Sequence, residues 1–157
     1  MSIEKVKAYF EKIGATEKIL EFSVSSATVA LAAEALGCEP ERIAKSLTFK
    51  EDEDGCIMVV CAGDAKVDNQ KFKAEFGIKA KMPSFDEVEN LCGHAAGGVC
   101  PFDVNSNVKV YLDISLKRFS TVFPACGSSN SAVELNIESL EKYSNYLKWV
   151  DVCKTIE

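Results

Sequence analysis

The segment RIAKSLTF, residues 42–49, decides how this fold can be built, because it places a lysine among residues that a strand would bury. Side chains alternate along a strand, so a chain that is extended from Ile43 carries one lysine and three apolar residues on one face. These four residues are Ile43, Lys45, Leu47 and Phe49. A lysine on an apolar face must extend its head to water, find a partner or serve a ligand.

A hairpin is predicted to follow directly from this segment. Two β-rich stretches within residues 46–63 flank an acidic turn, at which Gly55 is expected to supply a positive φ. On the first of these strands, Ser46 and Thr48 would lie on the wetter face, opposite Lys45.

Apolar spacing and capping residues predict helices along the rest of the chain. Their ranges are 2–13, 26–37, 40–45, 67–77, 84–93 and 137–144. Further strands are expected at 17–22, 79–82, 107–113, 118–127, 131–136 and 147–153. Lys45 would then lie where a short helix gives way to a strand. This irregular alternation predicts one α+β domain over residues 1–157, with a mixed sheet and helices around it.

Composition and length describe an ordinary globular protein. The chain has 157 residues, 47% of them hydrophobic and 27% charged, which is enough to bury a core without a metal or disulfides. No apolar run reaches the length of a membrane span, and the N-terminal residues lack the apolar core of a signal peptide. We therefore expect a cytoplasmic protein that does not insert into a membrane.

Seven cysteines are present, and none forms a C-x-x-C pair. An odd number without regular spacing argues against a disulfide framework and favours reduced, buried side chains. His94 lies between Cys92 and Cys100, but a zinc site there would need a fourth ligand and a more regular spacing. No metal and no cofactor are expected.

The formal net charge of −6 argues against a protein that coats nucleic acid nonspecifically. One window, residues 61–81, departs from this balance with five lysines against three acidic residues. Its lysines are Lys66, Lys71, Lys73, Lys79 and Lys81. They form either a solvated helix face or a surface that meets phosphates.

No standard catalytic motif is present: there is no nucleophile elbow, no P-loop and no dinucleotide-binding glycine pattern. Three features remain. Lys45 is either a lysine with a packed stem or a cation that holds a phosphate, a ribose oxygen or a carbonyl. The loop GHAAGGVCPF, residues 93–102, is either a surface turn or a source of backbone donors for an oxyanion. The segment ACGSSN, residues 125–130, is either a hairpin turn or a pocket wall.

Five segments in order give the chain a familiar pattern: TVALAAEALG, ERIAKSLTF, VVCAGDAKVD, GGVCPF and ACGS. Together, from about Thr28 to Leu135, they resemble the YbaK/ProX family of free-standing aminoacyl-tRNA deacylases. The same domain occurs as the editing insertion of bacterial prolyl-tRNA synthetases. The resemblance implies a compact α+β domain around a mixed, barrel-like sheet. It also implies hydrolysis, in trans, of the ester that joins a wrong amino acid to the acceptor end of a tRNA, most often tRNA-Pro.

The resemblance assigns roles to residues of this chain. The essential lysine of the family corresponds to Lys45, and backbone N–H groups near Gly97 and Gly98 would stabilise the oxyanion. The family's substrate-binding glycine loop also includes Pro101, and its closing turn corresponds to Gly127 and Ser128. Thr28, Ser46 and His94 are further expected substrate contacts that the resemblance does not itself assign, and Ser46 would have a supporting role. Water would be the nucleophile, since no general base is evident. A mischarged tRNA-Pro carrying cysteine or alanine would be the partner, with a transient synthetase association.

Cys100 departs from the family's usual loop and is expected to narrow or alter the pocket. Two alternatives to an editing hydrolase remain. The same pocket could bind a nucleotide or an aminoacyl group without turnover, and the cysteines could serve a redox or metal function.

Overall fold

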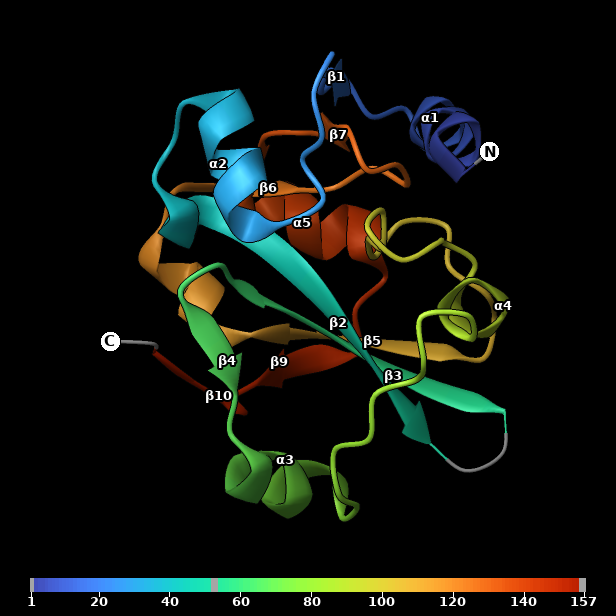
Figure 1. Ribbon diagram of the computed structural model, residues 1–157, viewed down its shortest axis with the longest axis vertical. Coiled ribbons are helices and arrows are strands. Elements are labelled where there is room, and N and C mark those ends of the chain that lie inside the picture. The colour runs from blue at the N-terminus through green and yellow to red at the C-terminus, as the bar shows by residue number, and fades with distance from the viewer. Residues whose placement is uncertain (1, 52–53, 156–157) are drawn as a thin grey trace.

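The computed structural model describes residues 2–51 and 54–155. Its centre is a mixed six-stranded sheet in the order β8–β6–β2–β3–β5–β9, which crosses the molecule in Figure 1. The strands are β2 (Ile43–Glu51), β3 (Gly55–Ala62), β5 (Val108–Asp113), β6 (Thr121–Pro124), β8 (Leu135–Asn136) and β9 (Lys148–Val150). The sheet curls into a half-barrel with helices around it. This confirms the predicted α+β class.

Two hairpin strands form the middle of this sheet. β2 and β3 pair antiparallel over their whole length, with Lys45 opposite Cys61. β2 also pairs in parallel with β6, and β3 in parallel with β5. Because β3 has neighbours on both edges and is covered on both faces, all its residues from Cys56 to Ala62 are buried. The predicted hairpin is confirmed, although its turn includes residues outside the described ranges.

Two smaller sheets flank the main one. β1 (Leu20–Glu21) pairs with β7 (Ser131–Ala132), and β4 (Ala65–Val67) pairs with β10 (Cys153–Thr155). Both pairs join segments that lie far apart in the sequence. The first holds the N-terminal region against the turn after β6, and the second holds the C-terminal region beside the end of β3.

Helices cover the sheet and its ends. They are α1 (Ser2–Lys12), α2 (Val29–Leu36), α3 (Asn69–Phe76), α4 (Val88–Cys92) and α5 (Ile137–Ser144), with 3₁₀ turns η1 (Pro40–Arg42) and η2 (Ile114–Arg118). Local chemistry sets their limits, as predicted. The side chain of Asp68 caps α3, that of Asn136 caps α5, and Gly37 ends α2 in the left-handed region. In Figure 1, α3 lies at the opposite end of the molecule from α1 and α2.

Several expected elements differ in the structure. The helix predicted at 40–45 ends at Arg42, so Lys45 is the third residue of β2 and not its boundary. Residues 79–82 form no strand and contribute one ladder-like bond, from the Lys50 N–H to the Lys81 carbonyl at 2.7 Å.

The late strands are also divided more finely than predicted. The stretch 131–136 supplies both β7 and β8, which pair with different partners, and 147–153 is split between β9 and the start of β10. η2 was not predicted.

Two side-chain predictions on the hairpin are wrong. Thr48 is only 4% exposed, so this position of the second face is buried, although Lys50 on the same face keeps a side chain that is 29% exposed. Gly55 does not have a positive φ. A Cβ at that position would lie 2.5 Å from the Glu51 carbonyl oxygen, so the glycine is required by a close approach instead.

The cysteines are free and six of the seven are buried, as the sequence predicted. Within residues 2–51 and 54–155, no group of three or more His, Cys, Asp or Glu side chains could hold a metal ion. No helix in these ranges is both long and apolar enough to cross a membrane.

Candidate functional site

A cavity of about 330 Å³ lies along the first half of β2. Its walls come from the segment that leads into α2, from β2, from the loop after α4 and from the β6–β7 region. Four residues singled out from the sequence line it: Thr28, Lys45, Ser46 and Gly97. Five do not: His94, Gly98, Pro101, Gly127 and Ser128. The volume suits a small ligand or one end of a larger one.

Lys45 is the only charged residue among the described residues that line the cavity. Its side chain is partly exposed, and its ammonium makes one long contact, 3.5 Å from Nζ to the Gly63 carbonyl oxygen. Lys45 makes no ion pair within the described part of the chain. The ammonium therefore keeps most of its hydrogen-bonding capacity for a bound group.

The rest of the β2 wall is apolar except for Ser46 and Thr48. Ile43 packs with Phe123 and with the alanines of α2. The Ser46 hydroxyl, in contrast, is buried and has no hydrogen-bond partner in the structure. A buried hydroxyl without a partner costs free energy, so its presence in a cavity wall favours a ligand group as its partner.

Thr28 has a structural task at the edge of the cavity. Its Oγ1 accepts a hydrogen bond from the Leu31 N–H at 3.2 Å and caps α2. The residues before it are attached to the turn after β6, because the Ser26 N–H donates to the Ser129 carbonyl at 2.6 Å. Thr28 therefore shapes the cavity through the position of α2.

Gly97 and Gly98, expected to act together, have different environments. Gly97 is exposed, has a φ of 93° and lines the cavity, and its N–H has no partner within the described residues. Gly98 is buried, and its N–H donates to the Ala95 carbonyl at 3.0 Å. Of the two glycines, only Gly97 lines the cavity and has an N–H without a partner within the described residues, so it is the one candidate backbone donor of the pair.

Gly98 instead joins two loops. A Cβ on Gly98 would lie 2.6 Å from the Ser128 nitrogen and 2.7 Å from the Gly127 carbonyl carbon. The segment 125–130 therefore supports the glycine loop from behind. The Ser128 hydroxyl is bonded within its own turn, to Asn130 Oδ1 at 2.9 Å and to Ser131 Oγ at 2.7 Å.

His94 and Cys100 lie on the core side of the same loop. His94 is fully buried, and its Nε2 lies 2.7 Å from the Phe102 carbonyl oxygen. Cys100 is also fully buried, with Sγ 3.6 Å from His94 Nε2. Neither residue lines the cavity, so a substrate contact by His94 and a pocket narrowed by Cys100 are both contradicted by the geometry. Pro101 is likewise buried outside the cavity.

Burial sets the ionisation of these groups. Desolvation lowers the pKa of His94, and it raises the pKa of the Cys100 thiol to about 12. At neutral pH, both are uncharged. His94 is therefore a core residue that anchors the loop through the Phe102 carbonyl, and it lacks the access that a general base needs.

The lysines of residues 61–81 are all exposed, but they are not equivalent. Lys71 donates to Asp151 Oδ1 and to the Cys153 carbonyl, both at 3.1 Å, so its charge is partly used within the molecule. Lys66, Lys73, Lys79 and Lys81 make no ion pair within the described residues. Lys81 precedes Met82, which lines the cavity and is 59% exposed, so this basic segment approaches the cavity edge.

Some cavity residues were missed in the sequence. Ser26, Phe123 and Ser131 line the cavity, although Ser26 was expected in an ordinary helix and Phe123 and Ser131 in ordinary strands. No local pattern marks them, because their place in the site depends on the pairing of β1 with β7 and of β2 with β6. Gly63 and Asp64, which do not line the cavity, lie within the motif VVCAGDAKVD, where the pair GD between two β-rich stretches is a turn signal.

Comparison with known proteins now adds to this geometry. A family model described as "Aminoacyl-tRNA editing domain" matches residues 24–143. The chain is 50% identical to the protein YwhH of Bacillus subtilis over 157 residues, which is 100% of both chains. It is 27% identical over 114 residues to EbsC of Enterococcus faecalis, named as a candidate Cys-tRNA(Pro)/Cys-tRNA(Cys) deacylase, covering 72% of this chain and 70% of that one.

A proline–tRNA ligase of Bacillus cereus is 28% identical over 116 residues, which are 71% of this chain and 20% of the ligase. The chain thus spans only about a fifth of that enzyme. Among solved structures, a candidate trans-editing enzyme for prolyl tRNA synthetase superposes with a TM-score of 0.87 and 28% identity. That match covers 98% of this chain and 97% of the other.

Proposed function

The chain belongs to the aminoacyl-tRNA editing domain family, and on that premise we propose that it is a trans-editing hydrolase for mischarged aminoacyl-tRNA. The observation that carries the proposal is the position of Lys45. It supplies the one charge in the described lining of a small, mostly apolar cavity, and its ammonium has only a long contact within the protein. The relatives that are named for tRNA deacylation or proline–tRNA ligation support tRNA-Pro as the substrate.

In the proposed reaction, the Lys45 ammonium holds the carbonyl oxygen or a neighbouring oxygen of the acceptor-end ribose. The Gly97 N–H is the backbone donor on the facing wall. A water oxygen attacks the ester carbonyl carbon, and the resulting negative charge develops on the carbonyl oxygen between these donors. The bond from the carbonyl carbon to the ribose oxygen then breaks, and that oxygen takes a proton. The products are a free amino acid and an uncharged tRNA.

No carboxylate or imidazole lines the described part of the cavity, so a group of the substrate itself is the proposed activator of water. The chemistry therefore relies on positioning and charge stabilisation more than on a protein base. Ser46 would gain a partner from a polar group of the bound aminoacyl moiety.

The apolar lining favours a small side chain such as that of cysteine or alanine. Ala32, Ile43 and Phe123 are among the apolar residues that line the cavity. A pocket of this kind separates substrates by only about 1–3 kcal/mol per methylene, so both mischarged forms are candidates. A tRNA substrate also implies a cytoplasmic protein and a transient encounter with the synthetase that made the error.

The proposal is tested by measuring amino-acid release from Cys-tRNA-Pro and Ala-tRNA-Pro, with correctly charged Pro-tRNA-Pro as the control. We expect release from at least one mischarged form and little from Pro-tRNA-Pro. Release from none of the three, or equal release from all three, contradicts editing of tRNA-Pro.

One alternative is favoured by the lack of a protein base in the lining: the same cavity could bind an aminoacyl or nucleotide group without turnover. Equilibrium binding of the aminoacyl-tRNA without release of amino acid would identify that function.

A further inference from the structure

The Lys45 ammonium contacts a turn that leaves the sheet directly after its partner strand. Lys45 pairs with Cys61 across the β2–β3 ladder, and β3 ends at Ala62. The chain turns at Gly63 and Asp64 before β4 begins. The carbonyl of Gly63 is 3.5 Å from Lys45 Nζ, so the turn faces the lysine from behind the cavity.

Gly63 fits closely against the elements that build the cavity wall. A Cβ there would lie 2.0 Å from the Pro40 carbonyl oxygen and 2.8 Å from Val29 Cγ1. Only glycine allows the turn to approach both η1 and the start of α2. The turn is thereby fixed on the side of the cavity.

A bidentate ion pair holds the other side of the turn. The guanidinium of Arg118, from η2, donates from Nη1 to Asp64 Oδ2 at 2.9 Å and from Nη2 to Asp64 Oδ1. The Asp64 side chain is only 19% exposed, so this pair is better shielded than most surface pairs. Hydrogen bonding by Arg118 lowers the pKa of Asp64, and the nearby charge of Lys45 lowers it further.

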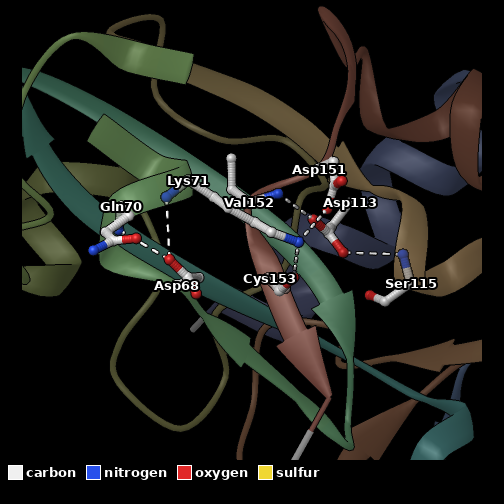
Figure 2. Close-up of polar contacts among 8 residues, drawn as sticks. All are labelled: Asp68, Gln70, Lys71, Asp113, Ser115, Asp151, Val152 and Cys153. Atoms are coloured by element: carbon white, nitrogen blue, oxygen red, sulfur yellow. Dashed lines mark hydrogen bonds and ion pairs between the residues drawn. The ribbon is translucent and has the colours of Figure 1, made fainter. Parts of the chain in front are cut away.

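Arg118, whose side chain is 41% exposed, is joined to a hydrogen-bond network that leads into the core. Its Nε donates to the Ser115 carbonyl at 2.9 Å, and Ser115 Oγ accepts from the Ala62 N–H at 3.0 Å. Asp113, which is 1% exposed, accepts from the Ser115 N–H and from the Val152 N–H, both at 2.9 Å. Figure 2 shows these two bonds converging on the Asp113 carboxylate. The network connects the end of β5 to the turn behind Lys45.

We propose that Asp64 and Arg118 are positioning residues for Lys45. Their ion pair fixes the turn so that the Gly63 carbonyl and the Asp64 carboxylate face the ammonium and direct it toward the cavity. A lysine stem has four rotatable carbons, so without such a guide the charge would sample many positions. An effect of these two residues on catalysis requires that Lys45 contacts the substrate, and this inference therefore rests on the proposed function.

Kinetics provide the first test. Asp64→Asn and Arg118→Gln should each lower kcat for amino-acid release by about tenfold or more, with KM changed little, because the misplacement affects the transition state most. Asp64→Glu keeps the charge and should recover part of the rate. The matched control is Glu75→Gln, which breaks the Lys148–Glu75 ion pair of 2.7 Å on α3 and should leave kcat unchanged.

A double-mutant comparison separates positioning from general destabilisation. The combined Asp64→Asn, Arg118→Gln variant should lose no more activity than either single variant, because both changes remove one contact. Losses that multiply, or an unchanged kcat in both single variants, would overturn the proposal. Equal thermal stabilities of Asp64→Asn and Glu75→Gln would exclude unfolding as the cause.

A second readout needs no enzymatic activity. The acetylation rate of Lys45 by an amine-reactive ester, measured by peptide mass spectrometry and normalised to Lys73, reports how the ammonium is held. Asp64→Asn should raise the normalised rate several-fold, whereas Glu75→Gln should not. An unchanged rate contradicts positioning even if the wild type proves to have no hydrolase activity, so the two proposals fail separately.

Discussion

The β2 wall of the cavity and the loop of residues 93–102 differ in how their polar groups are bonded. On the β2 wall, the Lys45 ammonium has one long contact and the Ser46 hydroxyl has none. In the loop of residues 93–102, the Gly98 N–H donates to the Ala95 carbonyl and His94 Nε2 contacts the Phe102 carbonyl, although neither residue lines the cavity and His94 Nδ1 has no hydrogen-bond partner in the structure. Unsatisfied groups are expected where a ligand completes them, and satisfied groups where the protein needs rigidity. We therefore propose the β2 wall as the side that acts on the substrate, whereas the loop is a structural support in which the Gly97 N–H has no partner within the described residues.

The substitution that should lower the free energy of unfolding most is at Gly98, which packs the loop of residues 93–102 against residues 127 and 128. In Gly98→Ala, the added Cβ meets the backbone of residues 127 and 128, which cannot move cheaply, so we expect the free energy of unfolding to fall by about 3 kcal/mol. Gly97→Ala meets nothing closer than 3.6 Å, and its φ of 93° should cost about 1 kcal/mol. Urea unfolding of both variants measures the difference, and a greater loss in Gly97→Ala would contradict this division of roles.

The next effect depends on pH and also concerns the loop of residues 93–102. Burial lowers the pKa of His94, so below pH about 6.5 the unfolded chain takes up a proton that the folded chain resists. The free energy of unfolding should therefore fall with pH, from about 6.5 down to the folded pKa, by up to about 1.4 kcal/mol per pH unit. His94→Gln removes this contribution. The test compares wild type and His94→Gln by the change in their free energy of unfolding between pH 7.5 and pH 5.5. An identical change in both proteins would show that His94 is not the titrating group.

Two serine substitutions should have smaller effects, which change the free energy of unfolding in opposite directions. Ser46→Ala removes a buried hydroxyl without a partner and should raise the free energy of unfolding by up to about 1 kcal/mol, while raising KM. Ser128→Ala removes a hydroxyl with two partners and should lower the free energy of unfolding by about 1 kcal/mol. Thermal unfolding distinguishes them. Equal losses in both variants would mean that the Ser46 hydroxyl is satisfied in solution.

The smallest effect concerns the exposed lysines outside the cavity. If Lys73 contacts a phosphate, Lys73→Gln should reduce the slope of log affinity for tRNA against log salt concentration by about 1. Lys148→Gln is the matched control, because Lys148 is already paired with Glu75 at 2.7 Å. Filter binding at several salt concentrations provides the slopes. A flat response in the wild type would assign these lysines to solubility.

Much of the fold could be predicted because its signals are local. The caps at Asp68 and Asn136 and the stop at Gly37 set helix limits from neighbouring residues alone. The division of residues 131–136 between β7 and β8 could not be predicted. It depends on partners more than a hundred residues away for β7 and on β6 for β8, and no local pattern records those pairings.

The candidate site divides in the same way. The two-residue period of a strand placed Lys45 on a buried face, and the family resemblance indicated the glycine loop. The burial of His94, the packing of Gly98 against residues 127–128 and the Asp64–Arg118 pair arise from contacts between distant segments. His94 was expected to contact the substrate because of its residue type, but it is fully buried and does not line the cavity.

The most direct test of the account is single-turnover release of amino acid from the preferred mischarged tRNA by wild type and by Lys45→Ala. Because Lys45 supplies the one charge in the described cavity lining, we predict a loss of about a hundredfold or more in rate, with the unfolding temperature nearly unchanged. A Lys45→Ala variant that remains folded and releases amino acid at the wild-type rate would contradict the proposal that hydrolysis depends on the Lys45 ammonium.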